Sequence, residues 1–380
     1  MRKKYLLTLL SIGALLVIAG CTGGDTSSVS GEPEENVITI GGIQPLTGDG
    51  ASYGIEMQRV AEIALADVNE AWTEEGMELV IQWEDGGCNG NDASTAAQKL
   101  VDVNKVEVIF GGFCSSETLA AAPITEEAGV ILLSGGSSSP DITDAGDYVF
   151  RTWPSDAFQG SILAKLANEL GYTTVAIISE QQDYTLGIST VFTEEFEALG
   201  GTVIEETFLS EDTDFKTQLT KLNNEGADAI FINAQTPIKG EVIIKQIQEL
   251  GIDGPFLLND GVGTNTEVLT SYSEFLEGAY TATVQIDENA DEMIQLQTTY
   301  NELYGEDLTS TVYAASTYDA VWILANALTE VGNDADAIRD YLNTLEGYNG
   351  LMGNISFDEN GDPLSGHSIF MIVEGALVVQ

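Results

Sequence analysis

The chain has 380 residues, of which 61 are acidic and 13 are basic, so its net charge at neutral pH is −48. Such a charge excludes nucleic acid as a partner, because binding to phosphates needs clusters of lysine and arginine. The length is too great for one typical domain, and we expect two.

The first 20 residues have the pattern of a secretion signal. A basic segment at residues 2–4 precedes an apolar stretch, Leu6 to Ile18, and two small residues lead to Cys21. This order is typical of secretory signals, and a cysteine directly after the small residues is typical of a lipoprotein. We therefore expect residues 1–20 to be removed and the Cys21 thiol to carry lipid. A transmembrane anchor is the alternative, but the apolar stretch is short for spanning a bilayer.

Residues 21–36 contain mainly Gly, Ser, Thr and acids, which is typical of a flexible tether. From Val37 onward, short apolar runs alternate with longer segments whose apolar residues recur at helical spacing. The expected strands are residues 37–43, 79–83, 106–110, 130–133, 148–151, 174–178, 202–208, 229–233, 255–258, 278–283, 353–357, 367–373 and 376–379. The expected helices are residues 54–70, 93–103, 116–127, 157–170, 187–199, 215–223, 240–250, 293–304, 313–331 and 335–345.

Repeated strand–helix alternation predicts an α/β fold with parallel sheets covered by helices on both faces. A single sheet of a dozen strands is improbable, so we expect two doubly wound lobes. Ligands of such folds bind beyond the carboxyl ends of the strands. The sequence therefore predicts a ligand site in the cleft between two facing lobes.

Two further cysteines follow expected strands of the first lobe. Cys88 comes after Asp85-Gly86-Gly87, and Cys114 comes after Gly111-Gly112-Phe113. An even pair in a secreted chain permits one disulfide, and loops after consecutive strands can meet. Closing a loop of about 25 residues would stabilise the fold by roughly 3–4 kcal/mol. Zinc is disfavoured, because the chain has a single histidine, His367.

A glycine-rich segment, residues 48–54 (GDGASYG), lies between the first expected strand and helix. It is similar to the dinucleotide fingerprint GxGxxG, but its spacing is one residue too long. We expect a tight turn that leads into a helix whose N-terminus faces the cleft.

Two serine-rich loops follow the third and fourth expected strands. Ser115 and Ser116 open a helix directly after Cys114, and free N–H groups at a helix start favour an anion. Simple capping by serine is the alternative reading. Residues 134–140 (SGGSSSP) follow the next strand, where glycines let a ligand approach the backbone. This loop is not a GxSxG elbow, and a triad could use only His367, so a hydrolase is disfavoured.

Two acidic turns complete the candidate sites. Asp260 follows the expected strand 255–258, and its carboxylate could receive an ammonium group through charge-assisted hydrogen bonds. A turn aspartate that bonds its own backbone is the alternative, and the sequence leaves both open. Residues 358–362 resemble part of a calcium loop but lack its length and closing glutamate, so a hairpin turn is favoured.

Eight segments together resemble the leucine/isoleucine/valine-binding family of periplasmic-type solute-binding proteins, the extracytoplasmic receptors of ABC importers. The likeness runs from Ile38 to about Val373. The segments are IGGIQPLTGDGASYG, EDGGCNG, FGGFCSSET, LLSGGSSSPDI, FRTWPSD, EQQDYTLG, LNDGVG and ISFDENGD.

The resemblance implies a type I periplasmic-binding-protein fold in which the chain crosses between the lobes three times. Lobe one would hold residues 37–154 plus 284–354, and lobe two would hold residues 155–283 plus 355–380. Closure about this hinge would trap the ligand. The resemblance also implies a disulfide between Cys88 and Cys114.

The same resemblance implies the ligand-binding residues. Serines and a glycine of lobe one would hold the α-carboxylate and α-amino group of an amino acid, and Asp260 would hold its ammonium. Gln235 stands where branched-chain binders have an aromatic residue, which would make the pocket larger or more polar. The full implied set is Ser115, Ser116, Gly136, Ser138, Tyr184, Asp260, Tyr53, Gln235 and Tyr313.

The resemblance implies a receptor that would deliver a branched-chain or other neutral amino acid to an ABC permease. Together with the lipid anchor indicated by the signal, we expect a lipid-anchored monomer. It would have no catalytic residue, no cofactor and no metal. The alternative is a sensor for amino acids or small amides, coupled to a signalling partner.

Overall fold

The computed structural model describes residues 36–380, which belong to one unit of the chain. The expected signal, the expected lipidation site Cys21 and nearly all of the expected tether lie outside these residues. Within residues 36–380, the structure has no helix with the length and apolar character needed to cross a membrane.

The first lobe is built on a five-stranded sheet in the order β2-β1-β3-β4-β5, in which all neighbours are parallel. Apolar residues alternate between its faces, so Ile40 packs on one side and Ile43 on the other. The strands are β1 Asn36–Gln44, β2 Met77–Asp85, β3 Val108–Gly111, β4 Ile131–Ser134 and β5 Val149–Arg151.

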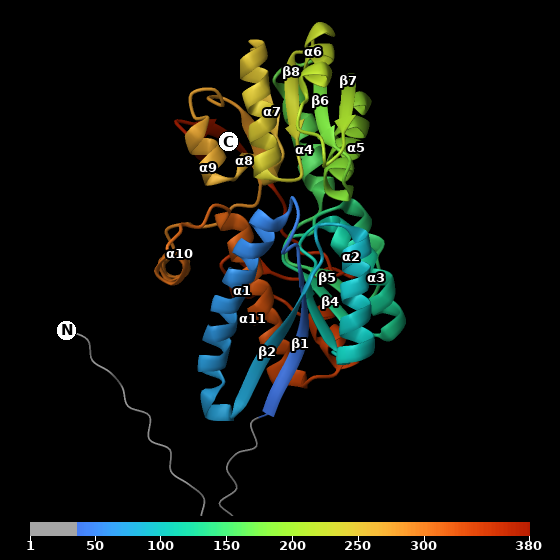
Figure 1. The fold of residues 1–380 in the computed structure, drawn as a ribbon, viewed down its shortest axis with the longest axis vertical. Helices are drawn as coiled ribbons and strands as arrows, with labels where there is room; N and C mark the ends of the chain where they lie inside the picture. Colours follow the sequence, from blue (N-terminus) through green and yellow to red (C-terminus); the bar gives the residue numbers. More distant parts are fainter. Residues whose placement is uncertain (1–35) are drawn as a thin grey trace, which may run out of the picture. The chain divides into compact units, whose positions relative to one another are not determined.

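Helices cover both faces of this sheet (Figure 1). Helices α1, α10, α11 and α12 pack on one face, and α2 and α3 pack on the other. Their bounds are α1 Ala51–Ala71, α2 Gly90–Gln98, α3 Ser115–Ala128, α10 Asp291–Tyr304, α11 Thr311–Val331 and α12 Ala335–Asn343.

The second lobe is built on a seven-stranded sheet in the order β14-β13-β10-β9-β8-β6-β7. Five strands are parallel: β6 Thr174–Glu180, β7 Thr202–Phe208, β8 Ala229–Asn233, β9 Phe256–Leu258 and β10 Tyr280–Thr283. Helices α4 Asp156–Glu169 and α5 Asp183–Ala198 cover one face. Helices α6 Lys216–Asn224, α7 Pro237–Leu250 and α9 Thr266–Ser271 cover the other.

These two lobes confirm the predicted α/β class with parallel sheets, and one edge of the second sheet adds two antiparallel strands. Strand β13 (Ser368–Val373) runs antiparallel to β10, and β14 (Ala376–Val379) runs antiparallel to β13. Glu374 and Gly375, both with positive φ, form the two-residue turn between them. Such a turn can only join antiparallel neighbours.

Several short elements escaped the sequence analysis. Strand β11 (Tyr348–Gly350) pairs antiparallel with β12 (Gly353–Ile355), and α8 is only four residues long, Asp260–Gly263. Helix α7 begins three residues earlier than expected, because the Thr236 hydroxyl caps the helix and Pro237 fits its first position. Short 3-10 helices at Thr73–Glu75 and Pro140–Asp144 were also missed, whereas the π-helical segment Lys99–Asn104 extends α2 within the expected helix 93–103.

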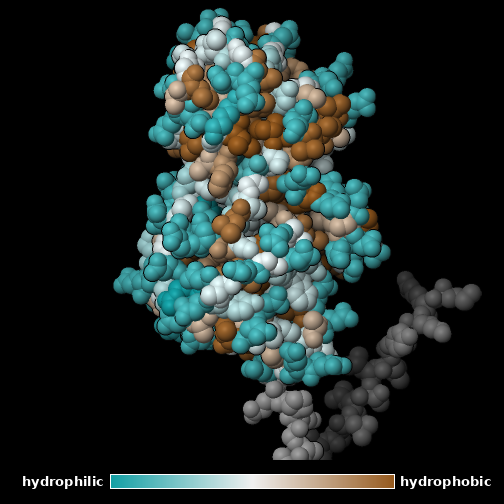
Figure 2. Space-filling model, turned by 180° about the vertical axis from the view of Figure 1, so that it is seen from behind, coloured by the Kyte–Doolittle hydropathy of each residue, from teal (hydrophilic) through white to brown (hydrophobic). Residues whose placement is uncertain are grey.

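The chain passes between the lobes three times, as the resemblance implied. The passages lie between β5 and α4, between β10 and α10, and between β12 and β13. The boundary residues 154, 283 and 354 stay predictions. Hydrophilic side chains cover much of the face in Figure 2, and hydrophobic ones gather mainly on the upper, second lobe.

A buried ion pair fastens the third passage to the first lobe. The Arg151 guanidinium, wholly buried, donates to both Asp362 carboxylate oxygens at 2.6 and 2.8 Å, and to the Ser139 carbonyl at 2.8 Å. Asp362 closes the expected hairpin turn, in which the Asp358 carboxylate accepts the N–H groups of Asn360 and Asp362. The turn is thereby held at the end of β5.

We expect Arg151→Met to lower the free energy of unfolding by about 3–5 kcal/mol, because it leaves the Asp362 carboxylate buried and unpaired. The double variant Arg151→Met/Asp362→Leu should recover part of this loss. Urea denaturation measures both. Lys216→Met, which removes an exposed pair with Glu249, is the control and should cost less than about 1 kcal/mol. An Arg151→Met loss no larger than the control's contradicts the fastening role.

Candidate functional site

A small cavity lies where loops at the carboxyl ends of both sheets meet. It is lined by Tyr53, Phe113, Cys114, Ser115, Gly136, Ser138, Tyr184, Gln235 and Tyr313. Its volume of about 10 Å³ is roughly the room that one water molecule needs. An organic ligand can therefore enter only if the two lobes move apart.

Seven of the nine predicted ligand-binding residues line this cavity, and an eighth, Asp260, is bonded to two of them. The ninth, Ser116, does not line it. Its hydroxyl donates instead to the Cys88 carbonyl at 3.1 Å, so it joins the disulfide loop to α3.

Asp260 is wholly buried at the start of α8. Its Oδ1 accepts a hydrogen bond from the Tyr184 hydroxyl at 2.5 Å, and its Oδ2 accepts one from the Tyr313 hydroxyl at 2.9 Å. Tyr184 belongs to the second lobe and Tyr313 to the first. The carboxylate makes no bond to its own backbone, because Asn259 caps the helix, so the turn-aspartate reading is wrong.

The carboxylate of Asp260 lacks a cationic partner in the part of the chain that the structure describes. Among residues 36–380, no lysine or arginine forms an ion pair with it. A buried carboxylate with only neutral partners is costly. Burial, together with the charge of Asp260, raises the pKa of Tyr184 and of Tyr313 well above the usual value, so both stay neutral donors.

A second acid lies beside the cavity, and sequence reasoning missed it. Asp156 is wholly buried at the start of α4, and its N–H donates to the Ser138 carbonyl at 2.8 Å. Burial raises the pKa of Asp156 well above its usual value, and the charge of Asp260 raises it further. The only signal in the sequence was its place at the end of the segment FRTWPSD.

The start of α3 forms the opposite wall. The Ser115 hydroxyl accepts the N–H groups of Ser138 and Ser139 at 3.2 and 3.0 Å, and the Ser134 hydroxyl accepts that of Gly136 at 3.2 Å. The amides of Gly136 and Ser138 are thus already occupied. On this wall, the groups that can still donate toward the cavity are the hydroxyls of Ser115 and Ser138 and the free N–H groups at the start of α3.

The disulfide between Cys88 and Cys114 is present, with the two Cα atoms 5.3 Å apart. Glu117, which the sequence analysis also missed, accepts the N–H groups of Cys88, Phe113 and Cys114 at 2.9–3.0 Å. Burial raises the pKa of Glu117 to about 7, although these three bonds lower it. Glu117 and the disulfide together fix the loops that carry Ser115. The position of Glu117, three residues after Cys114, is typical of a capping box and could have indicated this role.

An aromatic stack connects the cavity to the hinge. The Trp153 ring stacks on Tyr313 with ring centroids 4.2 Å apart, and His367 meets Trp153 edge to face at 6.5 Å. The ring nitrogens of His367 are buried and have no hydrogen-bond partner among the described residues. Burial lowers the pKa of His367 to about 4, so its ring is neutral at physiological pH.

We expect the single histidine not to titrate between pH 8 and pH 5, a range above the isoelectric point of about 4.1. Proton NMR of the untagged protein measures this directly. In the unfolded chain, His367 takes up a proton near pH 6.5, whereas in the native protein the ring stays neutral at that pH. The free energy of unfolding should therefore fall by about 2 kcal/mol more between pH 7 and pH 5 than it does in His367→Phe. An NMR midpoint near 6.5 contradicts this.

Comparison with known proteins decides the family. A model of the periplasmic binding protein family matches residues 37–376. The chain belongs to this family.

Among residues 36–380, no group of three His, Cys, Asp or Glu side chains is arranged to hold a metal ion.

Several proteins that this chain resembles have ligands in their names. The leucine-, isoleucine-, valine-, threonine- and alanine-binding protein of Pseudomonas aeruginosa is 29% identical over 84% of this chain and 85% of its own. A leucine-binding protein of Thermotoga maritima superposes with a TM-score of 0.79 at 29% identity, covering 90% of this chain and 97% of that one.

Two further solved structures differ in their ligands. The branched-chain amino acid transporter substrate-binding protein of Streptococcus pneumoniae, in complex with isoleucine, has a TM-score of 0.79 at 26% identity, covering 91% of this chain and all of that one. A solute-binding protein of R. palustris in complex with benzoate has a TM-score of 0.80 at 17% identity, covering 90% and 95%. The latter likeness is one of fold alone.

Proposed function

We propose that this protein is a monomeric extracytoplasmic receptor that binds a neutral amino acid between its lobes and delivers it to an ABC permease. The observation that carries the proposal is the buried carboxylate of Asp260, which lies beside the cavity and has only neutral partners. An ammonium group would neutralise this charge. The names of the relatives, which include transporter substrate-binding proteins, support the permease as partner.

The two ends of an amino acid match the two walls of the cavity. The ammonium would donate to Asp260, and the carboxylate would accept from the start of α3 and from the Ser115 and Ser138 hydroxyls. A benzoate-type acid brings only the negative end and would leave Asp260 unneutralised. The site therefore favours an amino acid over the aromatic acid bound by the neighbour of like fold.

The side-chain pocket is aromatic on one side and polar on the other. The rings of Tyr53, Phe113 and Tyr313 lie with their centroids 5.3–5.6 Å apart. Across from them, the Gln235 amide nitrogen lies 3.8 Å from the Cys114 sulfur. Such walls suit an apolar side chain with room for a small polar group, and so a branched-chain or other neutral amino acid.

Closure of the lobes would complete the site. Besides the bond from Tyr313 to Asp260, the Tyr53 hydroxyl donates to the Gly261 carbonyl at 2.5 Å, again from the first lobe to the second. These bonds must break for a ligand to enter a cavity that is too small for it, and they can reform around a bound ligand. The hydroxyls of Tyr53 and Tyr313 would thus stabilise the closed form, and their hydrogen bonds would be broken in the open form.

We expect Asp260→Asn to weaken amino-acid binding at least tenfold, because the desolvated ion pair is lost while the shape of the side chain is kept. A thermal-shift screen of the amino acids and benzoate identifies the ligand, and calorimetry measures its affinity. The variant should fold at least as well as the parent, because a buried unpaired charge is removed. Glu267→Gln, an exposed change in α9, is the control. Unchanged affinity, or a response to benzoate alone, contradicts the proposal.

We also propose that lipid on Cys21 holds the receptor at the membrane. Electrostatic attraction cannot replace it, since a net charge of −48 is repelled by anionic lipid surfaces.

We expect Cys21→Ser to move the protein from the membrane fraction to the soluble fraction of a bacterial host. Incorporation of labelled palmitate should be lost at the same time, whereas ligand binding by the released protein should be unchanged. Persistence of the variant in the membrane fraction after a high-salt wash contradicts anchoring by lipid at this residue.

A further inference from the structure

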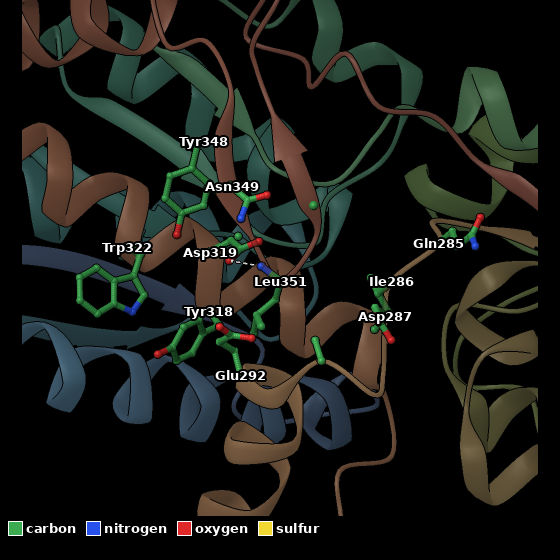
Figure 3. A pocket seen from close by; sticks show the side chains of 13 residues that line it. Gln285, Ile286, Asp287, Glu292, Tyr318, Asp319, Trp322, Tyr348, Asn349 and Leu351 are labelled. Atoms are coloured by element: carbon green, nitrogen blue, oxygen red, sulfur yellow. Dashed lines mark hydrogen bonds between the residues drawn. The ribbon is translucent and has the colours of Figure 1, made fainter.

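A second and larger cavity lies in the first lobe and shares no lining residue with the cavity beside Asp260. Its volume is about 410 Å³, within the range of small-molecule sites. Its walls come from the connector Gln285–Ala290, from one face of α11 and from the hairpin β11–β12 (Figure 3).

The walls of this cavity are aromatic and acidic. Tyr318 and Trp322 lie four residues apart on α11 and therefore share one face of the helix, and Tyr348 on β11 completes the aromatic wall. Figure 3 shows the three rings gathered on one side of Asp319. Asp287 and Glu292 add acids at the exposed rim, and no lysine or arginine lines the cavity.

Asp319 provides a buried charge at the centre of this wall. The residue is 1% exposed, and its carboxylate oxygens accept the N–H groups of Leu351 and Met352 at 2.9 and 2.7 Å. Burial raises the pKa of Asp319 to about 6, against the effect of these two bonds. Within residues 36–380 no cationic side chain pairs with it. The carboxylate thus lacks a counter-charge that a ligand could bring.

We propose that this cavity binds an organic cation whose charge is enclosed by methyl groups, such as a quaternary ammonium compound. The faces of Trp and Tyr rings attract cations, most strongly when water is excluded. A bare metal ion is less suited, because it requires several oxygen ligands in place of its water shell. A neutral molecule of the same shape would leave Asp319 uncompensated. Binding here is independent of the amino-acid site.

The experiment compares choline with 3,3-dimethylbutan-1-ol, in which carbon replaces the charged nitrogen. Calorimetry on the full chain should show choline binding at least about tenfold tighter than its neutral analogue. Choline binding should persist in Asp260→Asn, which removes the acid of the other cavity. Equal binding of the two compounds, or no detectable binding of choline, overturns the proposal.

Three variants locate the site. Asp319→Asn keeps one of the two oxygens that accept the hairpin N–H groups and should weaken choline binding at least about tenfold; Trp322→Leu should weaken it at least about fivefold. Glu302→Gln, an exposed acid of α10 outside the cavity, should leave it unchanged. If Asp319→Asn does not fold, Trp322→Leu decides. Choline binding that survives both changes but is lost in Asp260→Asn belongs to the other cavity and overturns the proposal.

Discussion

The carboxylate of Asp260 is a charge removed from water with no cation among residues 36–380 paired to it, and the arrangement of the two lobes follows from how it is held. One of its oxygens accepts a bond from Tyr184 in its own lobe, and the other accepts a bond from Tyr313 in the opposite lobe. One of these partners belongs to each lobe, so in the closure that we propose, closing the lobes and stabilising this charge occur together. Under this proposal, a cation that enters the cleft acts on the position of the lobes as well as on the acid.

The parallel sheets make this convergence possible. Strands β1, β3, β4, β6 and β9 all end toward the cleft, and the segments that follow them carry Tyr53, Ser115, Ser138, Tyr184 and Asp260. Tyr313 comes instead from the start of α11, which the chain reaches only after its second passage between lobes. The site therefore depends on residues from both sheets and on the second passage between the lobes. The Arg151–Asp362 pair fixes the third passage. The stack of Trp153 on Tyr313 connects the first passage to a residue of the site.

Sequence analysis predicted the features that depend on local pattern. It missed the hydrogen bonds for which several nearby groups could serve as partner. Apolar runs predicted every strand of the five-stranded and seven-stranded sheets, and motif resemblance predicted Asp260 and the cysteine pair. It could not show that hydroxyls of Ser134 and Ser115 occupy the amides of Gly136 and Ser138, because several nearby hydroxyls could do so and only packing selects one. Glu117 was missed for the same reason, since its three donors lie on two loops. Strand β11 was missed because the sequence of its three residues does not indicate a strand, and the strand forms by pairing with β12.

The two cavities share one physical feature, a buried acid with neutral partners, and the extreme acidity of the chain accounts for it. With 13 basic residues against 61 acidic ones, few cations are available to neutralise acids inside the protein. Arg151 is used for the buried pair with Asp362, while Lys99, Lys216 and Lys221 pair at the surface with about half of each lysine side chain exposed. Asp260 and Asp319 consequently remain buried among hydroxyls, amides and aromatic rings. A buried acid with neutral partners is most stabilised by a cation that arrives with a ligand, and the shape and lining of each cavity then decide which cation that is.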